Sequence, residues 1–400
     1  MSPTRQQPTR EQRVEWVWKP IEDLDWSRKK PADMTPAEQE FVEAAVLDDE
    51  GNYVPDLQRL KSLLAEHPSL IETAGAAALS VAFARRDTDE VVRFLMDNGA
   101  RFEYPEGVFS PVHEAAWKSS HSSWSVSQRR QATEKFRLIF ERGLADAAQI
   151  GIEPVHAMTS SHRTLLHITA TFGNPPLTEL LLEHGAGKVI EARLNANADT
   201  ALHRAAQAGH VWERRREVAR ILLEHGAYYD IFSASALDDD ERVRTLLAED
   251  SAGVDARHSD RTTPLHWAAA AGAPTCAETL LANGADVNAL NSGKKTPLHK
   301  AAAPLDAVPI EWTYPPIDKV IAALVANGAN INAQDDKGRT PLHLATYGGY
   351  KDAAEQLMAL GADTTIRNKR GKNALEVARM ACLYLKPRTA RGKTRTRRST

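Results

Sequence analysis

The chain contains 400 residues, of which 42% are hydrophobic, and its formal net charge is -3. This small average charge gives no reason to expect a nucleic acid or a strongly acidic partner, so an electrostatic signal can come only from an uneven distribution of charges. The two cysteines, Cys276 and Cys382, lie more than 100 positions apart. This spacing excludes a disulfide framework and a cysteine metal site, and it fits a reducing interior.

The N-terminal segment, residues 1–38, lacks the apolar core of a signal peptide, and no part of the chain approaches about 18 consecutive apolar residues. We therefore expect a cytoplasmic protein without a membrane span. Trp16, Trp18 and Trp26 stand close together in this segment. Because three tryptophans are rare in a wholly disordered tail, we predict that residues 14–26 pack against the start of the folded domain. The alternative is a short motif that binds another molecule.

A four-residue motif recurs along the rest of the chain. Its closest copies, separated by 33 and then 44 positions, are Thr263-Pro264-Leu265-His266, Thr296-Pro297-Leu298-His299 and Thr340-Pro341-Leu342-His343. The period is therefore 33 residues, with 11 residues inserted once. Related motifs in the same register begin at Ala77, Ser110, Thr164, Thr200 and Asn373. A degenerate ninth copy at residues 230–236 precedes a predicted helix over residues 240–248.

Each residue of the motif has a mechanical task. Thr263 can cap a first helix, and Pro264 fits its first turn, where the missing N–H has no cost. The leucine and the following alanine pair give this helix an apolar face with small side chains. A second helix carries an apolar stripe and ends at a glycine, which can adopt the left-handed conformation. These glycines are Gly99, Gly143, Gly185, Gly226, Gly284, Gly328 and Gly361.

The motif, the alanine pair and the ending Leu-Leu-x-x-Gly-Ala-Asp-Val-Asn-Ala resemble the ankyrin-repeat family over residues 39–385. The resemblance implies an all-α solenoid of about nine to ten helix-turn-helix units joined by short hairpin fingers. It also implies that the motif histidines bind the turn backbone between stacked units; these are His113, His167, His203, His266, His299 and His343. We expect three parts: an N-terminal extension (1–38), the repeat domain (39–385) and a basic, disordered tail (386–400).

Three repeats, which begin at Ser110, Thr200 and Thr296, contain insertions between their two helices. Each insertion contains a tryptophan, and the four aromatic residues concerned are Trp124, Trp212, Trp312 and Tyr314. Exposed aromatic residues on loops of a rigid scaffold are favoured anchors for partners. The alternative is that each ring folds back over the apolar ends of its own helices.

The finger tips before the last four motifs are basic, with eight cationic residues against two acidic ones. The tip residues that we consider candidates for partner binding are Asp260, Arg261, Lys294, Lys295, Asp336, Lys337, Arg339, Lys369 and Arg370. The segment after residue 385 adds seven cationic residues and no carboxylate. These charges could steer an acidic protein surface or a phosphate polymer, or they could simply keep turns and a terminus solvated.

No motif for catalysis is present: the sequence has no glycine-rich phosphate loop, no Gly-x-Ser-x-Gly elbow and no His-Glu-x-x-His. The pairs His156/His162 and His203/His210 lack the spacing of a metal site. Cys276 and Cys382 fall in predicted helices, where we interpret them as small core residues.

The sequence therefore favours a monomeric, non-catalytic scaffold without cofactor or metal, which binds a protein through the concave surface of fingers and first helices. The alternative is a nucleic-acid-associated protein that uses the basic fingers and tail. An enzyme with a site in a groove between repeats is a remote third reading.

Overall fold

The computed structural model describes residues 33–48, 54–83, 88–100, 133–134, 137, 158, 162–194, 198–207, 212–303 and 317–385. The chain divides into two compact units, here called unit 1 (residues 1–205 and 213–228) and unit 2 (residues 206–212 and 229–400). The described residues form short helices and contain no strand, which confirms the predicted all-α class. The number of repeats remains a prediction.

Unit 1 contains two groups of described helices. In the first group, α2 contacts α3, α4 and α5, and α5 packs against α6. In the second group, α9 packs against α10. The helices are α2 (Pro36–Ala44), α3 (Leu57–Glu66), α4 (Leu70–Thr73), α5 (Gly75–Phe83), α6 (Asp89–Asp97), α9 (Leu165–Phe172), α10 (Pro175–Glu183), η3 (Ala186–Val189), α11 (Ala201–Ala206) and α12 (Trp212–Glu224). Helix α2 begins N-terminal to residue 39, at a capping box formed by Thr35 and Glu38.

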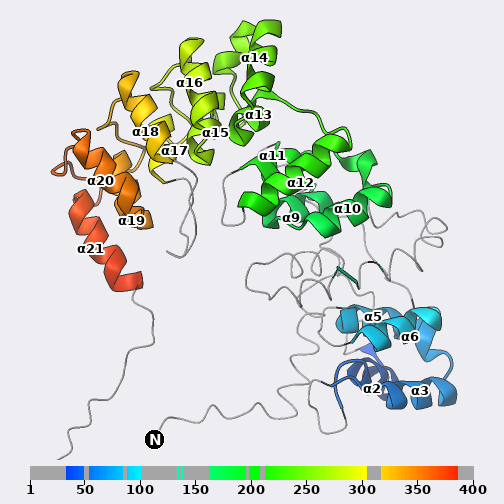
Figure 1. The fold of residues 1–400 in the computed structure, drawn as a ribbon. Coiled ribbons are helices and arrows are strands. Elements are labelled where there is room, and N and C mark those ends of the chain that lie inside the picture. Colours follow the sequence, from blue (N-terminus) through cyan, green and yellow to red (C-terminus); the bar gives the residue numbers. More distant parts are fainter. Residues whose placement is uncertain are drawn as a thin grey trace, which may run out of the picture. The chain divides into compact units, whose positions relative to one another are not determined.

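Unit 2 is a row of stacked helix pairs (Figure 1). The first helices, α13, α15, α17, α19 and α21, contact one another in chain order, and so do the second helices α14, α16, α18 and α20. Their bounds are α13 (Ile231–Leu237), α14 (Asp240–Glu249), η4 (Ser251–Asp255), α15 (Pro264–Ala271), α16 (Pro274–Ala282), α17 (Pro297–Ala302), α18 (Ile317–Ala326), α19 (Pro341–Gly348), α20 (Lys351–Ala359) and α21 (Ala374–Leu385). This stacking is what the 33-residue period predicts.

The motif threonines begin the first helices, as predicted. Thr263 has extended backbone, its hydroxyl accepts the His266 N–H, and Pro264 occupies the first turn. The repeats that begin at Thr164, Thr296 and Thr340 form the same capping box. In the degenerate copy, Asp230 replaces threonine and caps α13 by accepting the Ser233 N–H. The local start signal therefore survives where the motif is lost.

The motif histidines join successive repeats. Nδ1 of His266 accepts the Thr263 N–H at 3.1 Å, while Nε2 donates to the Lys295 carbonyl at 3.0 Å, one residue before the next motif. The same bridge links His167 to Asp199, His299 to Arg339 and His343 to Lys372. Because Nδ1 accepts and Nε2 donates, the geometry requires a neutral imidazole. The predicted role of these four histidines is confirmed. His203 accepts the Thr200 N–H at 3.0 Å and its bridge to the next turn stays a prediction, whereas His113 lies outside the described residues.

The second helices end at left-handed glycines. At the end of α16, Gly284 has φ of +87°, and the next amide, that of Ala285, donates to the Leu280 carbonyl at 3.0 Å. This closure satisfies a carbonyl that the helix leaves without an internal partner. The equivalent glycines Gly99, Gly185, Gly226, Gly328 and Gly361 also have positive φ. The predicted helix ends are confirmed, except at Gly143, which lies outside the described residues.

The core is built from the leucines and alanines of the motif. Leu265, Leu298 and Leu342 are at most 1% exposed, whereas Leu375 is 49% exposed. The first three are covered by the following repeat, but no described repeat packs beyond α21. Cys276 is fully buried in α16, which confirms it as a core residue. Cys382 lies in α21, as predicted.

The insertion of the Thr200 repeat differs from the prediction. Trp212 is the first residue of α12 rather than part of a loop, because the segment that follows it is rich in helix formers and has neither proline nor glycine. The insertion of the Thr296 repeat does lie between its two helices, α17 and α18. Trp124, Trp312, Tyr314, residues 14–26 and the tail 386–400 lie outside the described residues.

None of the helices in the described ranges has the length and apolar character needed to cross a membrane.

The buried histidines predict a specific acid sensitivity. Burial outweighs the bond to the Lys295 carbonyl and lowers the pKa of His266 from 6.5 to about 4. Between these values the unfolded chain binds a proton that the folded chain does not, so stability falls as pH decreases from about 6.5 toward 4. His266→Gln keeps an amide donor and acceptor but cannot titrate.

Urea denaturation of the two proteins at about pH 7 and about pH 5 measures the effect. At roughly 1.4 kcal/mol per pKa unit, the wild type should lose about 2 kcal/mol more than the variant between these conditions. Equal losses would show that His266 does not titrate in this way.

Candidate partner-binding surface

Four finger turns of unit 2 share one geometry. We call residues 258–262, 291–295, 335–339 and 368–372 the fingertip row. In each turn the first amide donates to the carbonyl of the fifth residue, for example Asn291 to Lys295 at 3.1 Å and Asp335 to Arg339 at 2.9 Å. In the last three turns that carbonyl also accepts Nε2 of the preceding repeat's histidine. Each of these three fingers is therefore fixed by the repeat before it.

Side chains within the fingers stabilise the turns. The Oδ1 atoms of Asn291, Asp335 and Asn368 each accept two backbone N–H groups from residues two and four positions later. Asp335 is buried and also pairs with Arg339 at 2.7 Å. Burial alone would raise the pKa of Asp335, but its bonds to Arg339 outweigh that effect and lower it. The fingers are thus closed by their own first residue.

A ladder of backbone hydrogen bonds joins neighbouring tips. The Ser292 amide donates to the Asp260 carbonyl at 2.9 Å, Asp336 to Gly293 at 3.0 Å, and Lys369 to Lys337 at 3.0 Å. These donors and acceptors occupy equivalent positions in their turns. The row is therefore one connected backbone surface across four repeats, rather than four independent loops.

One position in each finger has left-handed backbone. It lies two residues before the motif, and in unit 2 it is occupied by Arg261, Lys294, Gly338 and Gly371, with φ from +54° to +70°. His162 and Ala198 adopt the same conformation in unit 1. The turn requires this conformation whichever residue is present, and a side chain there adds strain that glycine avoids.

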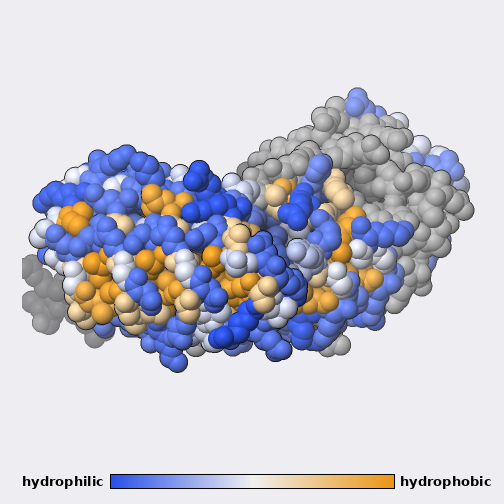
Figure 2. Space-filling view, turned by 90° about the horizontal axis from the view of Figure 1, so that it is seen from above, coloured by the Kyte–Doolittle hydropathy of each residue, from blue (hydrophilic) through white to orange (hydrophobic). Residues whose placement is uncertain are grey.

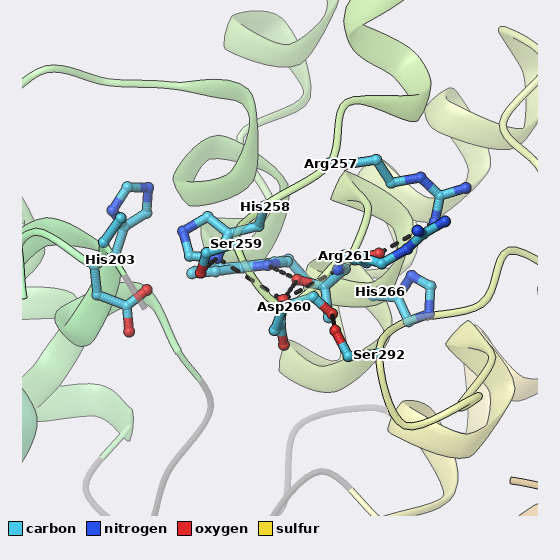
Figure 3. A network of polar contacts seen from close by, with 12 residues as sticks. His203, Arg257, His258, Ser259, Asp260, Arg261, His266 and Ser292 are labelled. Carbon is cyan, nitrogen blue, oxygen red and sulfur yellow. Dashed lines mark hydrogen bonds and ion pairs between the residues drawn. The ribbon is translucent and has the colours of Figure 1, made fainter. Parts of the chain in front are cut away.

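The first finger of the row, which includes His258, Ser259, Asp260 and Arg261 (Figure 3), is anchored by aromatic rings. His258 packs edge-on against Phe232 of α13 and Trp267 of α15, with ring centroids 5.4 and 5.3 Å away. Trp267 donates its indole N–H to Thr262, whose hydroxyl donates to Asp260. Burial raises the pKa of Asp260, but bonds from His258 and Thr262 prevail and hold it below its ordinary value. Asp260 is therefore ionised at neutral pH.

Ser259, His258 and Asp260 contain the groups of a hydrolytic triad, but not its arrangement. Ser259 Oγ lies 3.3 Å and Asp260 Oδ1 3.8 Å from the same ring atom, Nδ1 of His258. A proton relay needs the serine and the carboxylate on opposite ring nitrogens. These three residues consequently stabilise a turn and do not form a nucleophile with its base.

The candidate residues predicted at the tips differ in exposure. Asp260, Arg261, Lys294, Asp336, Lys337, Lys369 and Arg370 are exposed. Arg339 and Lys295 are only half-buried. The Arg339 side chain pairs with Asp335 and so has a role within the fold, whereas Lys295 contributes its backbone carbonyl to His266 and the role of its side chain stays a prediction. Whether the exposed residues bind a partner remains a prediction.

Two exposed aromatic residues of the described chain, Tyr228 and Tyr347, were not among the predicted candidates. Tyr347, on α19, is 63% exposed at a position where the two preceding repeats have Ala270 and Ala303. Aligning the first helices by register would have found it. The face shown in Figure 2 carries apolar patches beside hydrophilic areas. Exposed apolar residues of unit 2 include Leu290, Met358 and Leu360.

Cys276 has surroundings that suppress reactivity. Burial, together with the charges of Asp238 and Asp240, raises the pKa of its thiol far above the ordinary value. The thiolate that a nucleophile needs is therefore disfavoured. Asp238 instead caps α16, because its carboxylate accepts the Cys276 N–H at 2.8 Å and the Thr275 hydroxyl at 3.2 Å. The helix's own cap position, Ala273, has no side-chain acceptor.

The stacked helix pairs and their fingers define a helical-repeat scaffold. A family model described as ankyrin repeats (3 copies) matches residues 137–233 and 231–309, and one described as ankyrin repeats (many copies) matches residues 324–378. Together these spans cover more than half of the chain. The chain belongs to the ankyrin-repeat family. Ankyrin repeats generally mediate protein–protein interaction, and proteins built from them are typically non-catalytic.

Close contact between fingers predicts that substitution by alanine lowers the free energy of unfolding by different amounts at two glycines. Gly338 and Gly371 have nearly equal φ, +70° and +69°, but a Cβ at Gly338 would lie 2.9 Å from the Lys369 backbone nitrogen, whereas one at Gly371 would meet nothing. Gly371→Ala should cost about 1 kcal/mol from backbone strain. Gly338→Ala should cost roughly 1 to 3 kcal/mol more, because the ladder must shift. Urea denaturation measures both; equal losses would contradict tight finger packing.

Proposed function

We propose that this chain is a non-catalytic scaffold or adaptor that binds a partner protein through the concave surface of its fingers and first helices. The observation that carries the proposal is the connected fingertip row, in which backbone bonds between repeats hold exposed side chains in fixed places. A rigid surface loses little conformational entropy on binding, and so retains more of its contact energy as affinity.

Two further features support a protein partner. Tyr347 offers an exposed aromatic side chain on a first helix, and aromatic residues are enriched among binding hot spots. The candidate reactive groups are also engaged in stabilising the fold: the motif histidines bridge repeats, and Cys276 is buried with a raised pKa. Both features fit a scaffold better than an enzyme.

A second candidate function is association with nucleic acid. The exposed cationic tips favour it, together with the seven cationic residues after residue 385. Binding to phosphates would weaken steeply as salt increases, whereas a largely apolar contact would respond little.

We also infer a cytoplasmic monomer with an N-terminal extension over residues 1–38 and a basic tail over residues 386–400.

The proposal predicts that Tyr347 and Met358, which lie on different helices of one repeat, contribute differently to partner binding. A protein retained by the full chain in affinity capture from its native cells should be lost with Tyr347→Ala on the first helix α19. It should be kept with Met358→Ala. Met358 lies on the second helix α20, and its side chain is 40% exposed. Circular dichroism checks that both variants fold. Retention by both variants, or loss by both, would count against binding through the first helices.

A further inference from the structure

Five exposed cations of the fingertip row have no acidic partner within the described part of the chain, whereas the sixth, Lys372, lowers the pKa of Glu376 through its charge. Arg261, Lys294, Lys337, Lys369 and Arg370 are exposed, and none makes an ion pair there. Other finger cations do serve the fold. Arg339 pairs with Asp335, Arg367 pairs with Glu376 at 3.1 Å, and Arg257 donates to two finger carbonyls. The fold thus uses one set of cations and leaves another open to solvent.

Two of the open cations are held next to each other. The Lys369 amide donates to the Lys337 carbonyl at 3.0 Å, and Lys369 Cγ lies 3.3 Å from the place of a Cβ on Gly338. Arg370 follows directly in the chain. Because the backbones of the two tips are joined, one anionic segment that lies across them can reach both side chains.

We propose that the fingertip row of unit 2 binds an acidic segment of a partner protein, with the carboxylates of that segment meeting Arg261, Lys294, Lys337, Lys369 and Arg370. This inference rests on the proposed function and adds the chemistry of the partner. The ladder of backbone bonds supports it, because the cationic side chains start from fixed positions along a continuous row.

Two carboxylates in the row favour a peptide over a nucleic acid. Asp260 and Asp336 are exposed among the cations, and hydrogen bonds within the finger keep Asp260 ionised. A phosphate chain carries a charge at every nucleotide and would meet these carboxylates. A peptide can place acidic residues against the cations and a neutral donor against Asp260 or Asp336.

The test uses the full chain and a fluorescent peptide of alternating glutamate and serine, with a glutamine-serine peptide and an oligothymidine for comparison. Lys337→Gln/Lys369→Gln removes two tip charges. The matched control, Lys319→Gln/Lys351→Gln, removes two exposed charges from the second helices of the same two repeats. The tip variant should bind the acidic peptide about fivefold more weakly, while the control stays within about twofold of wild type.

A second double variant shows whether weaker binding results from loss of folding. Arg261→Gly/Lys294→Gly removes two tip charges and places glycine where φ is +63° and +54°. Glycine adopts this conformation without steric cost, so the melting temperature should stay the same or rise while peptide affinity falls. Unchanged affinity in both tip variants would overturn the inference. So would equal losses in the tip and control variants, or tighter binding of oligothymidine than of the acidic peptide.

Comparing capture of the partner by two variants distinguishes failure of the inference from failure of the proposed function. If the partner is lost with Tyr347→Ala but kept with Lys337→Gln/Lys369→Gln, the scaffold binds through its first helices and the acidic-segment inference is wrong. If the partner is kept by both variants, the proposed concave surface itself is wrong.

Discussion

The structure depends on a neutral, buried imidazole that bonds in two directions. In each well-formed repeat the histidine accepts the N–H of its own capping threonine and donates to a carbonyl at the base of the next finger. That carbonyl also closes the finger turn, so both of its lone pairs are used. A buried polar group left without such a partner would be destabilising, which is why the imidazole, the helix start and the finger are fixed together.

Because a histidine fixes each of the last three fingers from the repeat before it, helix stacking determines where these tips lie. The ladder from Asp260 to Ser292, Gly293 to Asp336 and Lys337 to Lys369 then joins the tips directly. Residues far apart in sequence thereby become neighbours on one surface. Surface side chains can vary on such a frame while the frame itself is kept, which is how a repeat scaffold acquires a particular partner.

Periodicity predicted the parts of the fold that depend on local chemistry. Capping threonines, first-turn prolines, terminal glycines and bridging histidines all follow from short-range rules, and the structure has them at the expected residues. The candidate surface was less predictable. Arg339 looked like a free tip residue, but its pairing with Asp335 depends on three-dimensional contacts. Trp212 was placed on a loop because insertions usually form loops, yet its neighbours favour helix. Exposure of Tyr347 depends on what the adjacent repeat leaves uncovered.

The tips form a connected backbone surface, and hydrogen exchange of individual amides in the full chain tests this connection most directly. The amides of Ser292, Asp336 and Lys369 belong to exposed residues, and each donates to the neighbouring finger. They should exchange slowly, with protection similar to that of the helix amides of the same repeats. Exchange of all three at the rate of unprotected surface amides would contradict the account, because the tips would then be independent loops.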